Sequence, residues 1–412
     1  MPTTDLSNGG YQKIQLIGFN QKFMFLLGIW PYKTGDIKEL LYESYFWLSL
    51  IYFLLFNTSG FALAILTWSD DYIATASSMG IVIEYVSCAY KILIFKSKTF
   101  KCLIRQIKIK ENQILQSQDS DFIKIYRQDA QDNKSLVLLY TIMGTTGISL
   151  YFIVPLVSNI VIPLDYNNKT GIIKHHFIVF TWFPFDPDRY YWAAYLIQFF
   201  GCLYGYAYIV HGGAFHLSIL SFIKLRLKII QHIFTNFTKY SEKSQREYKL
   251  ETAEQSQMVL LKLIILEHLD IIKFVKDLNQ AIRIYTLFNF IISSFQLSLV
   301  VYQLFKLPFL KVIPVFTYFT TLSTHLFLIY SAAHNISIES ENIASSIFKG
   351  NWDSYSFRVI KTMQMICIRA QKPLVMTIGP IADVKVTSLF QIFKALYSYI
   401  CIILRISNTK ID

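Results

Sequence analysis

Seven apolar stretches alternate with polar segments along the chain, and each is long enough to cross a lipid bilayer. An α-helix rises about 1.5 Å per residue, so about 20 apolar residues cross a hydrocarbon core about 30 Å thick. The predicted spans are Tyr45–Leu66, Tyr72–Phe95, Leu136–Pro163, Tyr190–Phe222, Ile284–Leu304, Val312–Ile338 and Val386–Ile406. The sequence therefore predicts an all-α, polytopic membrane protein with seven transmembrane helices.

Lysine and arginine are concentrated in alternate connections between these spans. They are frequent before the first span and in the connections that follow the second, fourth and sixth spans. The opposite connections contain only Lys169, Lys174, Arg189, Lys306 and Lys311. Because basic residues favour the cytosolic side of a membrane, the N-terminus is predicted to be cytosolic and the C-terminus extracellular. This orientation is opposite to that of a G-protein-coupled receptor.

Composition excludes several classes of protein. A chain of 412 residues with 53% hydrophobic and 16% aromatic residues is too apolar for a soluble protein. The net charge of +12 does not predict a nucleic-acid partner, because the basic residues lie beside the spans, where they contact lipid head groups. The 5 cysteines have no metal-binding spacing and are absent from the predicted outer connections, so neither a metal site nor a disulfide framework is expected.

The chain lacks the sequence motifs of common catalytic sites. It contains no Gly-rich phosphate loop, HExxH pair or GxSxG elbow. His211 and His216 are five residues apart in the fourth span and so do not share a helix face. Glu84 and Lys91 are two turns apart in the second span, and Glu84 is interpreted either as a structural hydrogen-bond partner or as lining a hydrated cavity. We expect no catalytic residue, no cofactor and no enzymatic activity.

Motifs in the last third of the chain resemble the C-terminal signature of insect odorant receptors. Gln371-Lys372-Pro373-Leu374 is similar to the family's Gln-Lys-Pro-Leu turn, and Thr377-Ile378-Gly379 to its Thr-Ala-Gly step. Phe393–Tyr399 is similar to its Leu-Lys…Ser-Tyr-Ser-Tyr-Phe helix, and Trp182–Asp186 to its second outer loop. The resemblance extends over the whole chain in topology. Departures from the family pattern are Ile378, Asp383, Lys385 and Ile400, together with Ser331–Asn335, which matches the family's aromatic-Gly-Asn step poorly.

This resemblance implies a function and partners. Members of the family are similar to ligand-gated, non-selective cation channels of four subunits, in which an odorant-tuned subunit joins a shared co-receptor in the plasma membrane of an olfactory dendrite. The co-receptor has a longer connection between spans four and five, so the short one here, about 223–283, favours the tuned subunit. The alternatives are a seven-helix G-protein-coupled receptor, which needs an outside N-terminus, a gustatory-type chemoreceptor, and a secondary transporter.

The resemblance also divides the chain into four parts. Residues 1–44 would be a cytosolic N-terminal segment, and residues 45–338 six transmembrane helices with a ligand pocket in their outer half. Residues 339–385 would be a cytosolic amphipathic segment that anchors subunits, and residues 386–412 a pore-lining helix with a short outer tail. From Thr252 to Asn279, apolar residues recur at intervals of three and four residues, which predicts that spans four and five continue as helices into the cytosol. An amphipathic linker is the alternative. Phe183–Pro187 is predicted to form a compact aromatic lid.

Residues of the last helix are candidates for a gate. Ser398, Ile402 and Ile406 lie four residues apart and share one stripe of the helix, and Tyr399 lies three residues before Ile402. An apolar ring can block ions by dewetting, without any charge. Packing of branched side chains in a membrane helix is the alternative interpretation.

A small apolar volatile requires a closed aromatic cavity with few polar groups. In span three, two glycines would leave room beneath the ring of Tyr151, although glycines can also serve close helix packing. The candidate ligand-binding residues are Met79, Val82, Ile83, Gly144, Gly147, Tyr151, Tyr195, Phe199, Phe316, Phe319 and Thr320. Asn168 lies in a glycosylation sequon of the long outer connection, whereas the sequons at Asn133 and Asn236 are predicted to be cytosolic.

Overall fold

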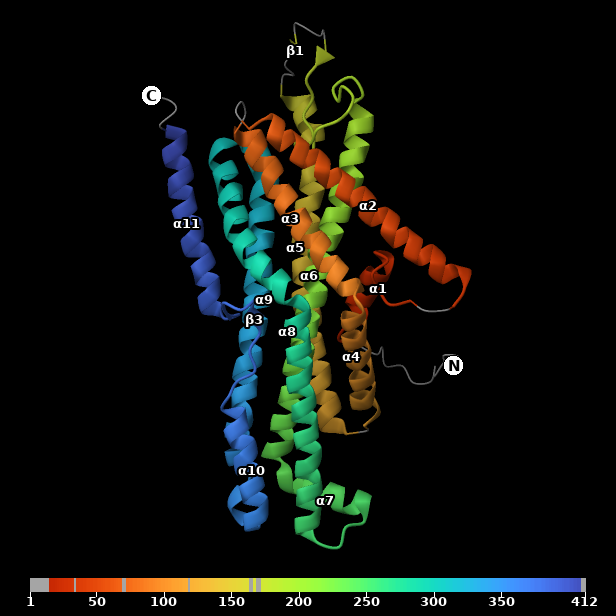
Figure 1. Ribbon diagram of the computed structural model, residues 1–412, viewed down its shortest axis with the longest axis vertical. Helices are drawn as coiled ribbons and strands as arrows, with labels where there is room; N and C mark the ends of the chain where they lie inside the picture. The colour runs from red at the N-terminus through yellow and green to blue at the C-terminus, as the bar shows by residue number, and fades with distance from the viewer. Residues whose placement is uncertain are drawn as a thin grey trace.

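Long helices running along the longest axis make up most of the molecule in the computed structural model (Figure 1). The structure describes residues 15–32, 35–68, 72–117, 119–162, 166–167 and 172–408, with side chains for all of these except 72–74, 76, 77, 166, 167, 172 and 402–408. In chain order the elements are α1 (Gly18–Leu26), α2 (Ile37–Leu66), α3 (Tyr72–Lys96), α4 (Lys98–Gln116), α5 (Ser120–Val161), β1 (Tyr166–Asn167), β2 (Ile172–Ile173), α6 (Tyr191–Thr235), α7 (Phe237–Tyr248), α8 (Ala253–Lys306), α9 (Phe309–Lys349), a 3-10 turn η1 (Trp352–Ser354), α10 (Phe357–Ala370), β3 (Thr377–Ile378), β4 (Ala382–Asp383) and α11 (Val386–Asn408).

Seven helices coincide with the seven predicted spans: α2, α3, α5, α6, α8, α9 and α11. Within the described ranges, 5 helices are long and apolar enough to cross a membrane on composition alone, and they are α2, α3, α5, α6 and α9. The span of α8 is less apolar because Ser293, Gln296 and Ser298 lie on its buried face. Polar residues that face protein rather than lipid lower the hydropathy of a span without preventing its insertion.

Several helices extend well beyond their predicted spans. α5 has 42 residues, α6 has 45 and α8 has 54. Side chains define where two of them begin. The Asp119 carboxylate accepts the backbone N–H groups of Asp121 and Phe122 at the start of α5, and Thr252 forms a capping box with Gln255 at the start of α8. The predicted helical continuation over Thr252–Asn279 is confirmed, because this segment belongs to α8.

The middle of α6 forms the centre of the bundle. Every residue from Val210 to Ile223 is buried, and α6 packs against both α5 and α9. Gly213 allows this close approach, since a Cβ atom there would lie 2.5 Å from Cε1 of His325 on α9. A side chain at this position would therefore push the two helices apart.

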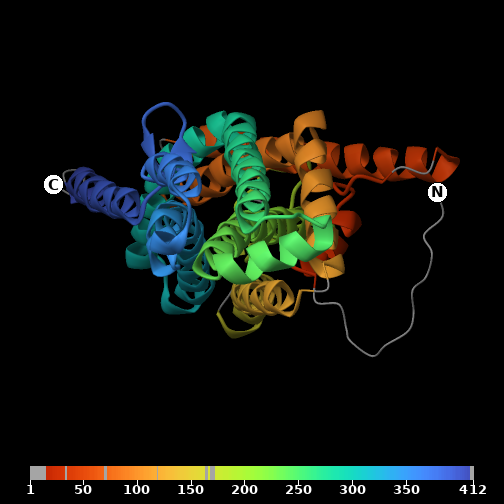
Figure 2. The ribbon, with the colours of Figure 1, turned by 90° about the horizontal axis from the view of Figure 1, so that it is seen from below.

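The first and last of the seven spanning helices, α2 and α11, lie at opposite edges of the bundle (Figure 2). On the first edge, α2 exposes a row of large apolar side chains, including Leu40, Leu48 and Leu55, as a lipid-facing helix does. On the other, α11 packs against α8 and α9. The β3–β4 hairpin fixes the start of α11 to α8, because Asn279 Nδ2 donates to the carbonyl of Val375 at 2.8 Å and Thr286 Oγ1 donates to that of Thr377 at 3.0 Å.

Ion pairs join the helices at the end of the molecule opposite the β1–β2 hairpin. Arg226 of α6, only 3% exposed, binds two carboxylates of α8, with Arg226 Nε 2.8 Å from Glu267 Oε1 and Nη2 2.6 Å from Asp270 Oδ2. Lys110 of α4 lies 2.6 Å from Oε2 of the same Glu267. We call these four residues the inner charge network. Three helices that are distant in sequence are thereby tied together.

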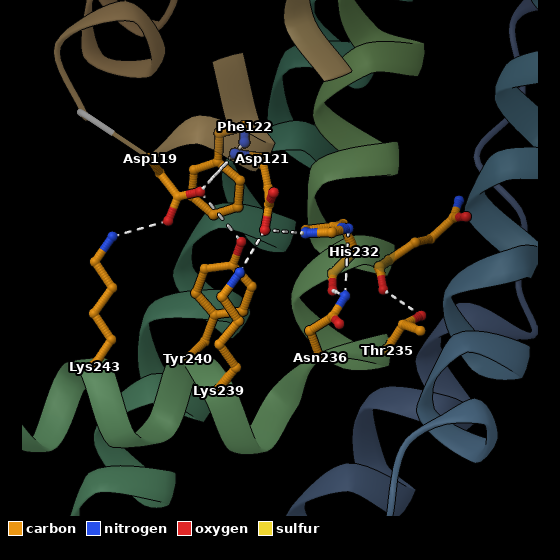
Figure 3. Close-up of polar contacts among 10 residues, drawn as sticks. Asp119, Asp121, Phe122, His232, Thr235, Asn236, Lys239, Tyr240 and Lys243 are labelled. Carbon is orange, nitrogen blue, oxygen red and sulfur yellow. Dashed lines mark hydrogen bonds and ion pairs between the residues drawn. The ribbon is translucent and has the colours of Figure 1, made fainter. Parts of the chain in front are cut away.

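A second set of ion pairs joins the start of α5 to α6 and α7 (Figure 3). Lys243 Nζ lies 2.8 Å from Asp119 Oδ2, and Lys239 Nζ lies 2.5 Å from Asp121 Oδ2. His232 Nε2 lies 3.6 Å from that same Asp121 oxygen. The hydrogen bond from Lys239 holds the pKa of Asp121 below its usual range. Burial by itself would raise the pKa of Asp119, but the hydrogen bond from Lys243 and bonds from backbone N–H groups together lower it.

Candidate ligand-binding site

A cavity of about 320 Å³ lies between α2, α3, α5, α6, α8 and α9, at the end of the bundle nearest the β1–β2 hairpin, which we call the outer end. Residues 175–187, which we call the outer strap, supply its remaining wall. Its volume lies at the lower end of the range for small-molecule pockets, about 300–1,000 Å³. The residues that line it from the helices are Leu63, Gly80, Ile81, Tyr151, Val154, Pro155, Ser158, Gln198, Val300, Gln303, Leu307, Lys311, Pro314, Val315 and Tyr318. We call this space the outer chamber.

Amide side chains on the helices hold the first half of the outer strap. Asn159, near the end of α5, makes two bonds to His176: its Oδ1 accepts the backbone N–H at 2.6 Å and its Nδ2 donates to the carbonyl at 3.1 Å. Gln198 of α6 accepts the N–H of Ile178 at 3.0 Å and donates to the carbonyl of Val179 at 2.9 Å. The two side-chain amides pair with backbone N–H and carbonyl groups of the strap as a neighbouring strand would. The strap backbone is therefore hydrogen-bonded where it crosses the cavity.

The second half of the outer strap contains the predicted aromatic lid. Phe183 and Pro187 line the outer chamber, and the rings of Phe183 and Phe185 lie 5.2 Å apart. The backbone N–H of Trp182 donates to the carbonyl of Ser59 on α2 at 3.1 Å. The lid is therefore compact and fixed to the helices, as the sequence predicts.

A second, smaller cavity of about 90 Å³ lies deeper, and we call it the inner chamber. Its walls are mainly aromatic and aliphatic, from Tyr85, Ile148, Cys202, Tyr206, Ile209, Val210 and Thr321, together with the two glycines of α5. Four residues line both chambers: Ile81, Tyr151, Val179 and Tyr318. The rings of Tyr151 and Tyr318 meet edge to face at 6.4 Å. The two chambers thus share one boundary and differ in polarity.

Three of the residues proposed from sequence line these chambers: Gly144, Gly147 and Tyr151. The two glycines have different surroundings. A Cβ atom at Gly144 would lie 2.5 Å from Cγ2 of Val210, so this glycine permits close packing of α5 on α6. A Cβ atom at Gly147 would meet Thr317 Oγ1 at 3.7 Å, an ordinary contact, so this position has spare room.

The other eight proposed residues lie outside the lining of both chambers. Tyr195 donates its hydroxyl to the carbonyl of Phe152 at 2.7 Å, and the ring of Phe199 lies 4.4 Å from that of Phe152. Phe316 is 54% exposed, and Thr320 donates to the carbonyl of Thr317. The remaining four, none of which lines either chamber, are Met79, Val82, Ile83 and Phe319.

Sequence reasoning did not select several residues that line the outer chamber. Ser158, Gln198, Gln303 and Lys311 are polar residues in or beside apolar spans, and the strap residue His176 joins them. Polar side chains within a membrane span usually face protein or water, and this signal could have identified Gln198 and Gln303. Glu84 is also buried and accepts a hydrogen bond from Cys88 Sγ at 3.4 Å, but it lines neither chamber.

The residues proposed for glycosylation and gating lie at or beyond the limits of the described structure. Asn168 lies outside the described residues, between β1 and β2. The backbone of α11 includes all four gate candidates, but the side chains of Ile402 and Ile406 are outside the described set. Ser398 Oγ lies 3.4 Å from the carbonyl of Lys394, and the Tyr399 ring lies 6.5 Å from that of Phe295 on α8.

Comparisons with known proteins agree with this architecture. The structure of the insect olfactory receptor OR5 from Machilis hrabei aligns with a TM-score of 0.75 at 15% identity, covering 95% of this chain and 97% of that one. The same receptor in complex with eugenol also aligns with a TM-score of 0.75, covering 98% of that chain.

Curated relatives are similar in sequence over shorter segments. Odorant receptor 10 of Aedes albopictus is 25% identical over 156 residues, which cover 38% of this chain and 41% of that receptor. Odorant receptor Or2 of Anopheles gambiae is 24% identical over 142 residues, which cover 34% of this chain and 38% of that receptor. The chain therefore matches about two fifths of the length of these relatives. The model of the 7tm odorant receptor family matches residues 73–397. This multi-pass membrane protein belongs to the 7tm odorant receptor family.

Proposed function

We propose that this chain is the odorant-tuned subunit of a ligand-gated, non-selective cation channel. A small, largely apolar volatile binds in the outer and inner chambers, and the channel forms as a heterotetramer with a co-receptor subunit in the plasma membrane of an olfactory dendrite. The N-terminus is cytosolic and the C-terminus extracellular, which places the inner charge network in the cytosol and the outer strap outside. Sensory transduction then needs no enzymatic step in this chain.

The position of the cavity relative to α11 is the main support for this proposal. Val300 of α8 and Tyr318 of α9 line the outer chamber, and α11 packs against these same two helices. A ligand that separates α8 from α9, or draws them together, therefore acts on the surface that holds α11.

The exposure of α11 supports its role at a subunit contact or pore. Tyr397 is 72% exposed and Phe390 is 61% exposed in the single chain. Large apolar side chains on a helix at the edge of the bundle have room to contact lipid, a partner subunit or the equivalent helix of a partner. We assign the pore-facing stripe to Ser398, Tyr399, Ile402 and Ile406.

The decisive experiment is co-expression with an insect co-receptor, followed by current recordings with an odorant panel. Ligand-dependent cation current is expected only when both subunits are present, and it should persist when G-protein signalling is blocked. Current that disappears under this block would favour the G-protein-coupled alternative. Each subunit expressed alone provides the control.

The gate assignment has its own test in these recordings. Ile402→Lys is expected to reduce cation current, because a fixed positive charge in a narrow pore of low dielectric constant repels a permeating cation. Ile403→Lys is the matched control, since its side chain lies about 100° around the helix. Equal effects at both positions, in channels that reach the surface, would contradict the assignment.

A further inference from the structure

The charge of the outer chamber is unbalanced. Lys311 is the one lysine or arginine among its described lining residues, and no aspartate or glutamate lines it. Lys311 Nζ lies 3.2 Å from Nδ1 of His176 on the outer strap and makes no ion pair with a described residue. The nearby Asp188 is occupied by His175, whose backbone N–H donates to Asp188 Oδ1 at 2.7 Å. Among the described residues, the chamber therefore presents a cation without a counter-ion.

Two neutral polar side chains that line the same chamber also lack a hydrogen-bond partner among the described residues. Ser158 is fully buried, and its hydroxyl has no hydrogen-bond partner among the described residues. Gln303 is 7% exposed, and its side-chain amide makes no hydrogen bond within the part of the chain that the structure describes. Gln198, by contrast, uses both ends of its amide to hold the strap. Buried polar groups are nearly always paired in native proteins, so Ser158 and Gln303 are suited to an acceptor on a ligand.

Ser158 and Lys311 lie beside the same part of the outer strap, and Gln303 lines the same chamber. Ser158 immediately precedes Asn159, which holds the backbone of His176, and His176 contacts Lys311. Gln303 enters the wall from α8 opposite Gly80 of α3, where a Cβ atom would lie 4.0 Å from Gln303 Nε2. The inner chamber, on the far side of Tyr151 and Tyr318, has no charged lining residue among those described. One end of the cavity is cationic and the other is apolar.

We propose that the cavity selects small monocarboxylic acids with an unbranched apolar tail. The carboxylate binds Lys311, with Gln303 and Ser158 as further donors, and the tail passes between Tyr151 and Tyr318 into the inner chamber. This inference rests on the proposed function and names the ligand class of the same site. A carboxyl group like that of glutamate, with a pKa of about 4.3, is ionised at neutral pH and so supplies the missing anion. A charge-assisted bond to a carboxylate is stronger than one to a neutral oxygen.

Three probes of equal chain length test this selectivity: octanoic acid, 1-octanol and methyl octanoate. They are applied to the chain co-expressed with an insect co-receptor, and potencies are taken from dose–response currents. Octanoate is expected to be at least about tenfold more potent than 1-octanol, the effect of one hydrogen bond to a charged group. Lys311→Met should reduce this potency ratio by about tenfold, and Lys311→Arg should restore most of it. Lys306→Met, a change of the exposed lysine in the same outer connection, should leave the ratio unchanged.

A binding measurement on purified full-length protein separates the inference from the proposed function. Octanoate should raise the unfolding temperature of the unmodified protein more than 1-octanol does, and Lys311→Met should remove that difference. Responses to neutral odorants without any preference for octanoate would overturn the ligand class and leave the receptor function standing. A preference for octanoate that survives Lys311→Met would overturn the role of Lys311. No current from surface-expressed channels with any odorant would overturn the proposed function, and the binding measurement would then decide the ligand class alone.

Discussion

The outer and inner ends of this bundle hold their helices together by different means. At the outer end the helices stand apart around two chambers, and neutral amides such as Gln198 and Asn159 connect them through the outer strap. At the inner end, α4, α6 and α8 are drawn together by Arg226 and its carboxylate partners. These neutral hydrogen bonds leave a space that a small molecule can enter, in which Lys311 is the one lysine or arginine among the described lining residues. The inner end also has a cavity, of about 410 Å³, but Lys110, Arg226 and Glu267 line it, so charged groups occupy its wall. Charge pairs strengthen in a partly buried setting, and the difference teaches that the inner end serves stability and the outer end ligand binding.

The largest expected effect is at the inner end. Arg226→Met leaves Glu267 and Asp270 without their main partner and should destabilise the protein by about 2–4 kcal/mol. This is less than for a fully buried pair, because the carboxylate side chains are 32% and 44% exposed. The unfolding temperature of the purified protein measures it. Lys239→Met, which breaks an ion pair at an exposed lysine, is the control and should change little. If the two substitutions lowered the unfolding temperature equally, the inner charge network would contribute no more to stability than an exposed ion pair does.

The second-largest effect tests whether the outer end controls ligand potency and the inner end only stability. Gln198→Leu removes the amide partner of the N–H of Ile178 and of the carbonyl of Val179, at a total cost of about 1–3 kcal/mol, because a loosened outer strap admits water to these groups. We expect ligand potency to fall at least about tenfold. Gln231→Leu is the matched change at the inner end, where this amide donates to the carbonyl of Glu339 at 2.7 Å. It should lower stability without altering the rank order of ligands, and a changed rank order would contradict the division between the ends.

A smaller effect tests the inner chamber through two glycines of one helix. Gly147→Ala adds a methyl group where there is room, so the protein should fold normally and lose about tenfold in potency toward its longest ligands. Gly144→Ala places a Cβ atom against Val210 and should instead reduce surface expression, because overpacking costs about 1–3 kcal/mol. Dose–response series combined with surface labelling separate these outcomes. Similar behaviour of both variants would mean that the inner chamber does not set ligand length.

The smallest effect concerns which end is outside the cell. Asn168→Gln should abolish a glycosidase-sensitive mass shift, whereas Asn236→Gln should leave it unchanged. Asn236 follows the last residue of α6, at the end of the bundle that carries the ion pairs of α7, and its Nδ2 donates to the carbonyl of His232 at 3.0 Å. The measurement is the gel mobility of each variant with and without glycosidase treatment. A shift that depends on Asn236 would reverse the proposed orientation.

The sequence predicts the helices well because the signal for a membrane span is local. Twenty consecutive apolar residues suffice, and the N-caps at Asp119 and Thr252 lie within a few residues of the helix starts that they define. The compact lid at Phe183–Pro187 is also predictable, because its rings and prolines are neighbours in sequence.

The cavity is less predictable because distant segments build it. Helical spacing places Gly144, Gly147 and Tyr151 on one face of α5, but it cannot show that Phe316 points away from the protein. Hydrogen bonds from Asn159 and Gln198 hold the outer strap in position. The periodicity of the sequence does not reveal these bonds. In the sequence Lys311 counts only as a basic residue of an outer connection, and its role depends on the fold around it.

Two prolines described only as lining residues bear on the speed of the response. Pro155 of α5 and Pro314 of α9 both stand inside their helices and line the outer chamber. A proline inside a helix removes one backbone hydrogen bond and lowers the resistance to bending there. The terminal turns beyond them carry Asn159, which holds the strap, and Lys311. For a ligand that enters or leaves by displacing the strap, these weakened turns set the rates of arrival and departure. Replacing either proline with alanine should therefore lengthen the time that a ligand stays bound more than it alters how tightly the ligand binds.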